Sequence, residues 1–272
     1  MFALKKINDE VVREVPIQKL DLRPVKGAAL FPVLDANIFL CARKKSGKTS
    51  AVFKILKRCA GPRTKIMVFC STVHKDESWN TIRLWAQQRC IPFVAYTSLI
   101  DDNGNNLLAD LIDGLQKEKD EKEGKEGKEG QEEIDLLLEE PDEPEEEVAR
   151  SKYRTPEWIF VFDDLADELR KPIVATFLRK NRHFLAKTII SSQYINDIYP
   201  AARKQLDYVI LFKGHQQKKI DEIGKDVDIG VPKDELWDLY KFATEEPYSF
   251  LYCDVRGGTF RRNFNELIEI QE

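Results

Sequence analysis

The chain has 272 residues, 42% of them hydrophobic and 33% charged, which is long enough for one substantial α/β domain. It contains no apolar run of the roughly 18 residues that a membrane helix needs, and its start does not read as a signal peptide. The five cysteines are odd in number and lack metal-ligand spacing, so we expect a reducing, intracellular setting without a disulfide framework or zinc site.

The net charge of −4 is distributed unevenly along the chain. Residues 116–150 contain sixteen acidic and six basic side chains, so the rest of the chain has a net charge of +6. A modestly basic body is compatible with a polyanionic partner such as nucleic acid. Many ordinary domains share this balance, so charge alone favours nucleic acid only weakly.

Residues 1–35 contain short apolar patches interrupted by prolines, and we expect them to form an N-terminal arm. The apolar run 38–41 then predicts a buried strand, and apolar residues recur at helical spacing over 51–59. A basic loop separates the two elements. It consists of Ala42, Arg43, Lys44, Lys45, Ser46, Gly47, Lys48, Thr49 and Ser50.

A strand, a loop ending in Gly-Lys-Thr and a helix are the setting of a phosphate-binding loop, whose backbone N–H groups cradle an anion at the helix N-terminus. In that motif Lys48 would reach the β- and γ-phosphates and the Thr49 hydroxyl would hold Mg²⁺. Ala42 departs from the motif, which has glycine there. The alternative is a basic loop that resembles a nucleotide site by chance.

The next segments alternate between strand and helix patterns. Strands are expected at 65–70 and 93–96, and helices at 76–90 and 107–115, with the tryptophans of the first helix packed in the core. Residues 116–150 then combine low apolar content, high charge and a repeated Lys-Glu-Gly unit. We expect this acidic segment to be a disordered surface insertion, because it cannot repay the entropy of ordering.

The strongest second motif is an apolar strand over 158–162 that ends at Asp163 and Asp164. Strands that are apolar throughout belong in the middle of a parallel sheet, and ligands bind at the carboxyl ends of such strands. Asp163 would contact Mg²⁺, and Asp164 would orient or deprotonate a water. The alternative is a strand that is simply capped by turn-forming aspartates.

The remaining pattern completes a mostly parallel α/β fold. We expect a helix over 165–180 interrupted at Pro172, a strand at 187–191, a helix over 194–206 broken near Pro200, and a strand at 208–212. A helix at 233–242 and a hairpin formed by 248–253 and 259–264 follow. One domain therefore comprises 36–115 and 151–272.

Four stretches together resemble a known family. They are the Phe-Asp-Asp end of the strand, Asn181-Arg182-His183, Ile189-Ile190-Ser191-Ser192-Gln193 and Pro200-Ala201-Ala202-Arg203. These resemble the poxvirus-type DNA-packaging ATPases of nucleocytoplasmic large DNA viruses, in the FtsK–HerA class. The resemblance covers residues 31–264 without the acidic insertion. It implies a P-loop NTPase fold of the RecA-like (ASCE) type that uses ATP and Mg²⁺ to move double-stranded DNA into capsids.

The resemblance also implies residue roles. Lys48 and Thr49 match the phosphate- and Mg²⁺-binding pair, Asp163 the second Mg²⁺ contact and Asp164 the water-activating acid. Gln193 matches the residue that senses the γ-phosphate, on a strand expected between the other two. The alternative for Gln193 is a helix cap.

Arg182 and Arg203 match candidate arginine fingers for a neighbouring subunit, which implies a ring of five or six copies. Alternatively, each is an ordinary surface residue. DNA would be held through its phosphates, with Lys213, Lys218 and Lys219 as candidate contacts. A capsid or portal-type component would be a further partner, and the location would be the viral factory in the host cytoplasm and the virion.

Two other functional interpretations are consistent with the sequence. One is a different P-loop NTPase, such as a small kinase or a GTPase-like switch, although no guanine-reading Asn-Lys-x-Asp motif is present. The other is a non-hydrolysing structural protein that keeps a nucleotide-binding loop.

Overall fold

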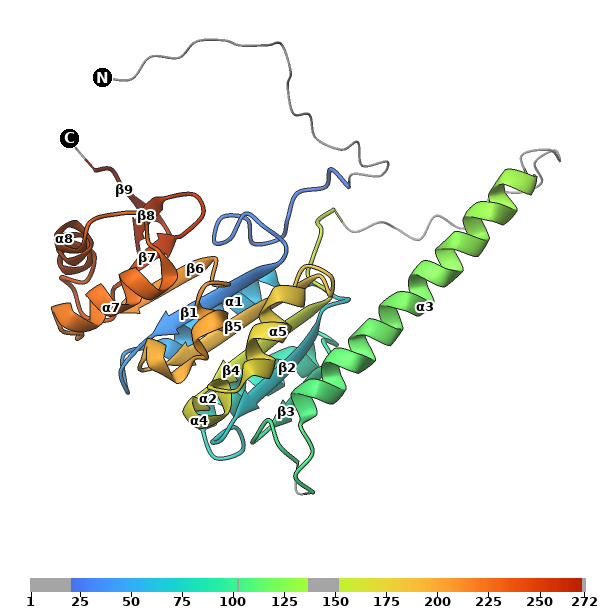
Figure 1. Ribbon diagram of the computed structural model, residues 1–272, viewed down its shortest axis with the longest axis horizontal. Coiled ribbons are helices and arrows are strands. Elements are labelled where there is room, and N and C mark those ends of the chain that lie inside the picture. Colours follow the sequence, from blue (N-terminus) through green and yellow to red (C-terminus); the bar gives the residue numbers. More distant parts are fainter. Residues whose placement is uncertain (1–20, 102, 137–151, 271–272) are drawn as a thin grey trace, which may run out of the picture.

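The computed structural model describes residues 21–101, 103–136 and 152–270 (Figure 1). The strands are β1 (Ala36–Cys41), β2 (Lys65–Cys70), β3 (Phe93–Tyr96), β4 (Trp158–Asp163), β5 (Ala186–Ser192), β6 (Tyr208–Phe212), β7 (Phe250–Asp254), β8 (Thr259–Arg262) and β9 (Glu266–Ile268). The helices are α1 (Lys48–Cys59), α2 (Glu77–Gln88), α3 (Leu107–Leu136), α4 (Ala166–Leu169), α5 (Pro172–Lys180), α6 (Pro200–Arg203), α7 (Gln217–Val227) and α8 (Lys233–Ala243), with a 3₁₀ turn η1 (Ile195–Asp197).

The strands of the described residues form one nine-stranded sheet in the order β3-β2-β4-β5-β1-β6-β7-β8-β9. The pairs from β3 to β6 are parallel, and β7, β8 and β9 add an antiparallel meander. The α/β fold with a mostly parallel sheet and a C-terminal hairpin is therefore confirmed. β9, which pairs with β8, was not predicted.

β5 lies between β4 and β1, the arrangement that the resemblance implied. Asp163 is in register with Ser191, and Cys41 with Ser192. All residues of β1 and β5 are buried, as expected for central parallel strands covered on both faces. This register brings the carboxyl ends of three strands to one edge of the sheet.

Helices cover both faces of the sheet (Figure 1). α1 and α2 pack on one face around Val52, Ile55 and Trp79. The other face is covered by the start of α3 and by α4 to α8, around Phe160 and Phe177. Trp79 is fully buried, so its predicted packing role is confirmed.

The structure differs from the sequence-based expectation in the acidic segment. The helix expected over 107–115 begins at Leu107 but continues to Leu136, and it extends beyond the sheet (Figure 1). Lys, Glu and Gln are good helix formers, and Lys–Glu pairs recur four residues apart, which offsets a cost of about 1 kcal/mol for each glycine. Residues 137–150 and 1–20 lie outside the described residues, so the proposed domain boundaries stay a prediction.

The segment 194–206 also differs from its prediction. It forms η1 and α6 instead of one interrupted helix. Pro200 has no N–H to continue a helix, and the Asp197 carboxylate accepts a hydrogen bond from the Ser192 hydroxyl and pairs with Arg170. α7 was not predicted, although Ile220, Ile223 and Val227 give it a buried face at helical spacing.

Among the described residues, no helix is both long enough and apolar enough to cross a bilayer.

Candidate active site

The loop between β1 and α1 is a tight turn closed by its own backbone. Ser46 donates to the Arg43 carbonyl through its N–H at 3.3 Å and its hydroxyl at 2.7 Å. Lys45 and Gly47 have left-handed backbones, with φ of 65° and 94°, and Gly47 is the N-cap of α1. The loop therefore leads directly into the positive end of a twelve-residue helix.

Ala42 fits this loop without strain. Its backbone is not in the left-handed region, in contrast to Lys45 and Gly47, so the position does not require glycine. Its N–H donates to the Ser192 carbonyl at 3.1 Å, and its methyl group is buried in the core beside α1. Glycine would supply the same backbone N–H, so the departure from the motif leaves the β1–β5 pairing unchanged and adds only a buried methyl group.

Lys48, the first residue of α1, reaches across β5 to the end of β4. Its ammonium lies 2.9 Å from Asp163 Oδ1 and 2.6 Å from Asp164 Oδ1, and its side chain is 14% exposed. Burial alone would lower the pKa of Lys48, but the two carboxylates outweigh it and raise the pKa. The ammonium is therefore firmly charged at neutral pH.

Asp163 is the buried member of the carboxylate pair, with 4% exposure. Burial raises its pKa, and the nearby Lys48 charge opposes that shift. Asp163 Oδ1 lies against the Lys48 ammonium, so a bound cation would have to take over this oxygen from Lys48.

The residues around Asp163 fit Mg²⁺ held together with a nucleotide. Mg²⁺ prefers oxygen ligands and usually takes one or two from the protein and the rest from phosphates and water. Asp163 and the hydroxyl of Thr49, in the first turn of α1, are suitable donors. Among the described residues, no cluster of three or more His, Cys, Asp or Glu side chains forms a closed metal site.

Asp164 differs from Asp163 in its exposure and backbone. It has a φ of 53°, its side chain is 38% exposed, and its N–H donates to the Ser191 carbonyl at 3.3 Å. Asp tolerates the left-handed region better than most residues. The turn at the end of β4 therefore places one carboxylate in the interior and the next one in reach of water.

Gln193 follows β5 directly, between the ends of β4 and β1. Its carbonyl accepts a weak hydrogen bond from Cys41 Sγ at 3.3 Å. The helix-capping alternative is not observed, because η1 begins at Ile195 after Tyr194 and has no side-chain cap. The topology thus brings Gln193 to the same edge as Lys48 and Asp163.

The two arginines lie elsewhere in the same chain. Arg182 is exposed in the turn that precedes β5, at the amino edge of the sheet. Arg203 is largely buried, donates to the Ile198 carbonyl at 2.9 Å and pairs with Asp226 at 2.6 Å. A finger acts on a neighbouring subunit, so both assignments stay predictions, and Arg203 would have to leave an existing ion pair.

Comparison with known proteins adds to this geometry. Neither a protein-family profile nor a curated protein matches the sequence. Among solved structures, the genome-packaging NTPase B204 from Sulfolobus turreted icosahedral virus 2 in complex with AMP matches with a TM-score of 0.51 and 18% identity, over 88% of this chain and 100% of that chain. B204 from Sulfolobus turreted icosahedral virus, a DNA-packaging ATPase, matches with a TM-score of 0.51 and 16% identity, over 88% and 98%.

The chain shares the fold of these B204 structures. The resemblance inferred from sequence motifs is confirmed at this level, in a P-loop NTPase fold that covers most of both chains. At these identities the comparison establishes the architecture, and the residue roles rest on the geometry of this chain.

Sequence reasoning missed a group of buried contacts behind the loop between β1 and α1. The imidazole Nε2 of buried His215 lies 3.2 Å from the carbonyl of Cys41, the last residue of β1. The His215 N–H donates to Tyr240 Oη, which donates to the Phe212 carbonyl. Burial lowers the pKa of His215 to about 4, so the ring is neutral. No motif in the sequence marks this position.

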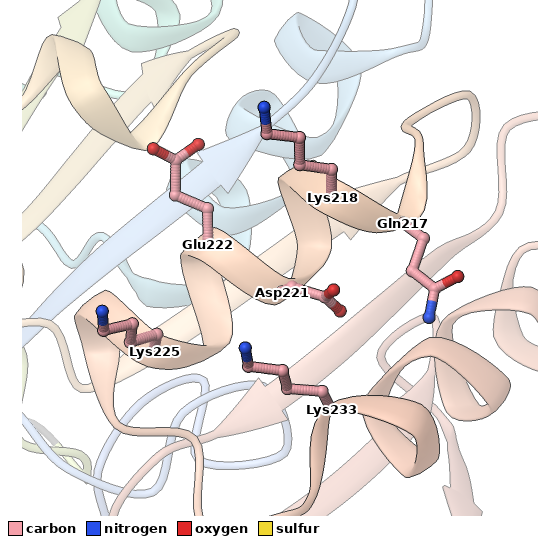
Figure 2. Close-up of a pocket in the computed structure, with 6 residues that line it drawn as sticks. All are labelled: Gln217, Lys218, Asp221, Glu222, Lys225 and Lys233. Carbon is pink, nitrogen blue, oxygen red and sulfur yellow. The ribbon is translucent and has the colours of Figure 1, made fainter.

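The three lysines suggested as DNA contacts have different surroundings. Lys213 Nζ donates to the Glu245 carbonyl, and the Lys219 ammonium lies 4.0 Å above the Tyr194 ring. Lys218 lines an open hollow on α7 and the start of α8 (Figure 2). Its lining residues are Gln217, Lys218, Asp221, Glu222, Lys225 and Lys233. None of them belongs to the phosphate loop or to β4.

Proposed function

We propose that this protein is an ATP-hydrolysing motor that moves double-stranded DNA into a viral capsid. The observation that carries the proposal is the placement of the Lys48 ammonium between Asp163 and Asp164. The loop motif that contains Lys48 lies more than a hundred residues before the aspartate pair in the sequence. The fold shared with packaging ATPases supports it.

The chemistry follows from the positions of these side chains. The loop N–H groups and Lys48 would bind the phosphates of ATP, while Thr49 and Asp163 would hold Mg²⁺, which neutralises charge on the β- and γ-phosphates. Asp164, which is open to solvent, would orient or deprotonate the attacking water. Gln193 would contact the γ-phosphate from the end of β5 and so distinguish ATP from ADP.

Transport requires more than one copy of the chain. A ring of five or six subunits would allow Arg182 or Arg203 to reach a neighbour's nucleotide. Lys213, Lys218 and Lys219 would contact DNA phosphates, which gives binding without base readout. A capsid or portal-type component would anchor the ring, in the cytoplasm of an infected cell.

The test is ATP hydrolysis by the Lys48→Ala variant, with and without duplex DNA. We expect the variant to keep its fold, judged by circular dichroism, and to lose DNA-stimulated hydrolysis. Lys54→Ala is the matched control, because Lys54 is an exposed lysine of the same helix. ATP hydrolysis at the wild-type rate in Lys48→Ala would contradict the assignment of Lys48 to a nucleotide site.

Stimulation by DNA separates the motor from the other readings. A small kinase or GTPase-like switch would hydrolyse nucleotide at a rate that duplex DNA does not change. A structural protein with a nucleotide-binding loop would bind ATP without turnover, even under conditions in which it oligomerises.

A further inference from the structure

An exposed tyrosine lies beside the phosphate loop. Tyr248 is 72% exposed, and a Cβ atom placed on Gly47 would lie 3.7 Å from its Cδ1 atom. The ring therefore borders the residue that precedes Lys48 while most of its surface faces solvent. Large exposed aromatic rings beside a ligand-binding loop are candidates for contact with that ligand.

The segment that carries Tyr248 is held in place from several sides. This segment, residues 244–249, connects α8 to β7. Lys213 Nζ donates to the Glu245 carbonyl, Arg262 pairs with the Glu246 carboxylate at 2.8 Å, and the Ser249 hydroxyl donates to the Glu246 carbonyl at 2.6 Å. Tyr248 itself has a left-handed backbone with a φ of 62°. These hydrogen bonds and the ion pair thus hold Tyr248 in a backbone conformation that is unfavourable in free energy and leaves its ring exposed.

The direction of Lys48 indicates which end of a nucleotide Tyr248 would meet. The Lys48 ammonium points toward β4, so the γ-phosphate end would lie on the β4 and β5 side of β1. The nucleoside end would then leave on the opposite side of β1, over β6 and β7. Tyr248 is two residues from the start of β7, on that side.

We propose that Tyr248 is the platform on which the nucleotide base stacks, and that it gives the site a preference for purines without separating adenine from guanine. This inference rests on the proposed nucleotide site. A flat aromatic ring stacks on the π-face of any base, and a purine offers the larger face. The phenol ring supplies no pattern of donors and acceptors along the base edge, so ATP and GTP bind alike.

The experiment is a calorimetric measurement of the affinities for Mg-ATP, Mg-GTP, Mg-CTP and inorganic tripolyphosphate. Wild-type protein is compared with Tyr248→Ala, Tyr248→Phe and Tyr194→Ala. We expect Tyr248→Ala to weaken ATP and GTP binding by roughly 5- to 150-fold, the range for loss of one aromatic–base stack. Tripolyphosphate affinity should be unchanged, and Tyr248→Phe should retain wild-type values.

Tyr194→Ala is the matched control, because Tyr194 is the other exposed tyrosine at this edge of the sheet, on the β5 side. Its loss should leave all four affinities unchanged. The inference is overturned if Tyr248→Ala changes none of the affinities, or if it weakens tripolyphosphate and ATP binding equally. It is also overturned if Tyr194→Ala weakens nucleotide binding as much as Tyr248→Ala does. Wild-type protein that binds neither ATP nor tripolyphosphate overturns the nucleotide site, and the inference with it.

Discussion

Asp163 and Asp164 are neighbours in sequence and share the ammonium of Lys48, yet the Asp163 side chain is buried and the Asp164 side chain is partly exposed. The left-handed backbone of Asp164 produces this separation at the end of β4. A buried carboxylate suits a bound cation, and an accessible one suits a water molecule. Binding of a triphosphate by Lys48 would draw the ammonium away from Asp164 and free that carboxylate for chemistry.

Asp164→Asn is expected to separate binding from hydrolysis. The amide keeps the size of the side chain but cannot accept a proton, so ATP hydrolysis should fall by roughly 10²- to 10⁴-fold. Affinity for ATP should be retained, as measured by calorimetry beside steady-state hydrolysis. Asp167→Asn, at an almost fully exposed position three residues away, is the control. Unchanged turnover in Asp164→Asn would remove this residue from the reaction.

Arg182 can be tested as a finger by mixing subunits. The Arg182→Ala variant should hydrolyse ATP poorly, since its neighbours lack the cation. Lys48→Ala subunits still carry Arg182, so mixing the two inactive variants should restore part of the hydrolysis at shared interfaces. The measurement is hydrolysis as a function of the mixing ratio, with Lys180→Ala as the nearby control. Activity that never rises above the sum of the two variants contradicts the assignment.

We expect Arg203 to stabilise the folded chain. Its guanidinium is mostly buried and bonded to Asp226 and to the Ile198 carbonyl, so Arg203→Ala leaves both partners unsatisfied. We expect the free energy of unfolding to fall by about 1–3 kcal/mol, measured by urea denaturation. An Arg203→Ala variant as stable as the wild type but unable to hydrolyse ATP would instead support the finger role.

The lowered pKa of His215 predicts that the folded protein loses stability in mild acid. The pKa of His215 is lowered to about 4 in the folded chain against 6.5 when unfolded, so the unfolded state binds the proton first as the pH falls. Stability is therefore full above pH 6.5 and decreases toward pH 4, by up to about 3 kcal/mol. Urea midpoints at several pH values measure this.

The control for this titration is a substitution that cannot bind a proton in this range. His215→Gln keeps an amide that can donate to the Cys41 carbonyl and should flatten the pH dependence. His74→Gln, at an exposed position, should leave it as in the wild type. Equal slopes in the wild type and His215→Gln would contradict the assignment.

The central part of the fold could be predicted from the sequence because its signals are local. The all-apolar runs of β1, β2, β4 and β6 mark buried parallel strands, and the two motifs at strand ends identified Lys48, Asp163 and Asp164. The structure brings these residues together. The predicted roles of Gln193 and of the two arginines depend on a nucleotide or on a second subunit.

The features that could not be predicted from the sequence depend on tertiary contacts or on a competition between helix propensity and disorder. His215 and Tyr248 lie in loops without a motif, and their place beside the phosphate loop follows from the pairing of β6 with β1 and β7. α3 was predicted too short because glycine and charge were read as disorder, while the helix propensity of Lys and Glu was given too little weight.

The central position of β5 has a consequence for synthesis of the chain. Cys41 and Gln193, which meet at the candidate site, are 152 residues apart, and β4 cannot reach β1 until β5 fills the gap between them. Such distant pairings form slowly and late. A growing chain on the ribosome would therefore make its lysine loop early but complete the proposed nucleotide pocket only after β5 emerges.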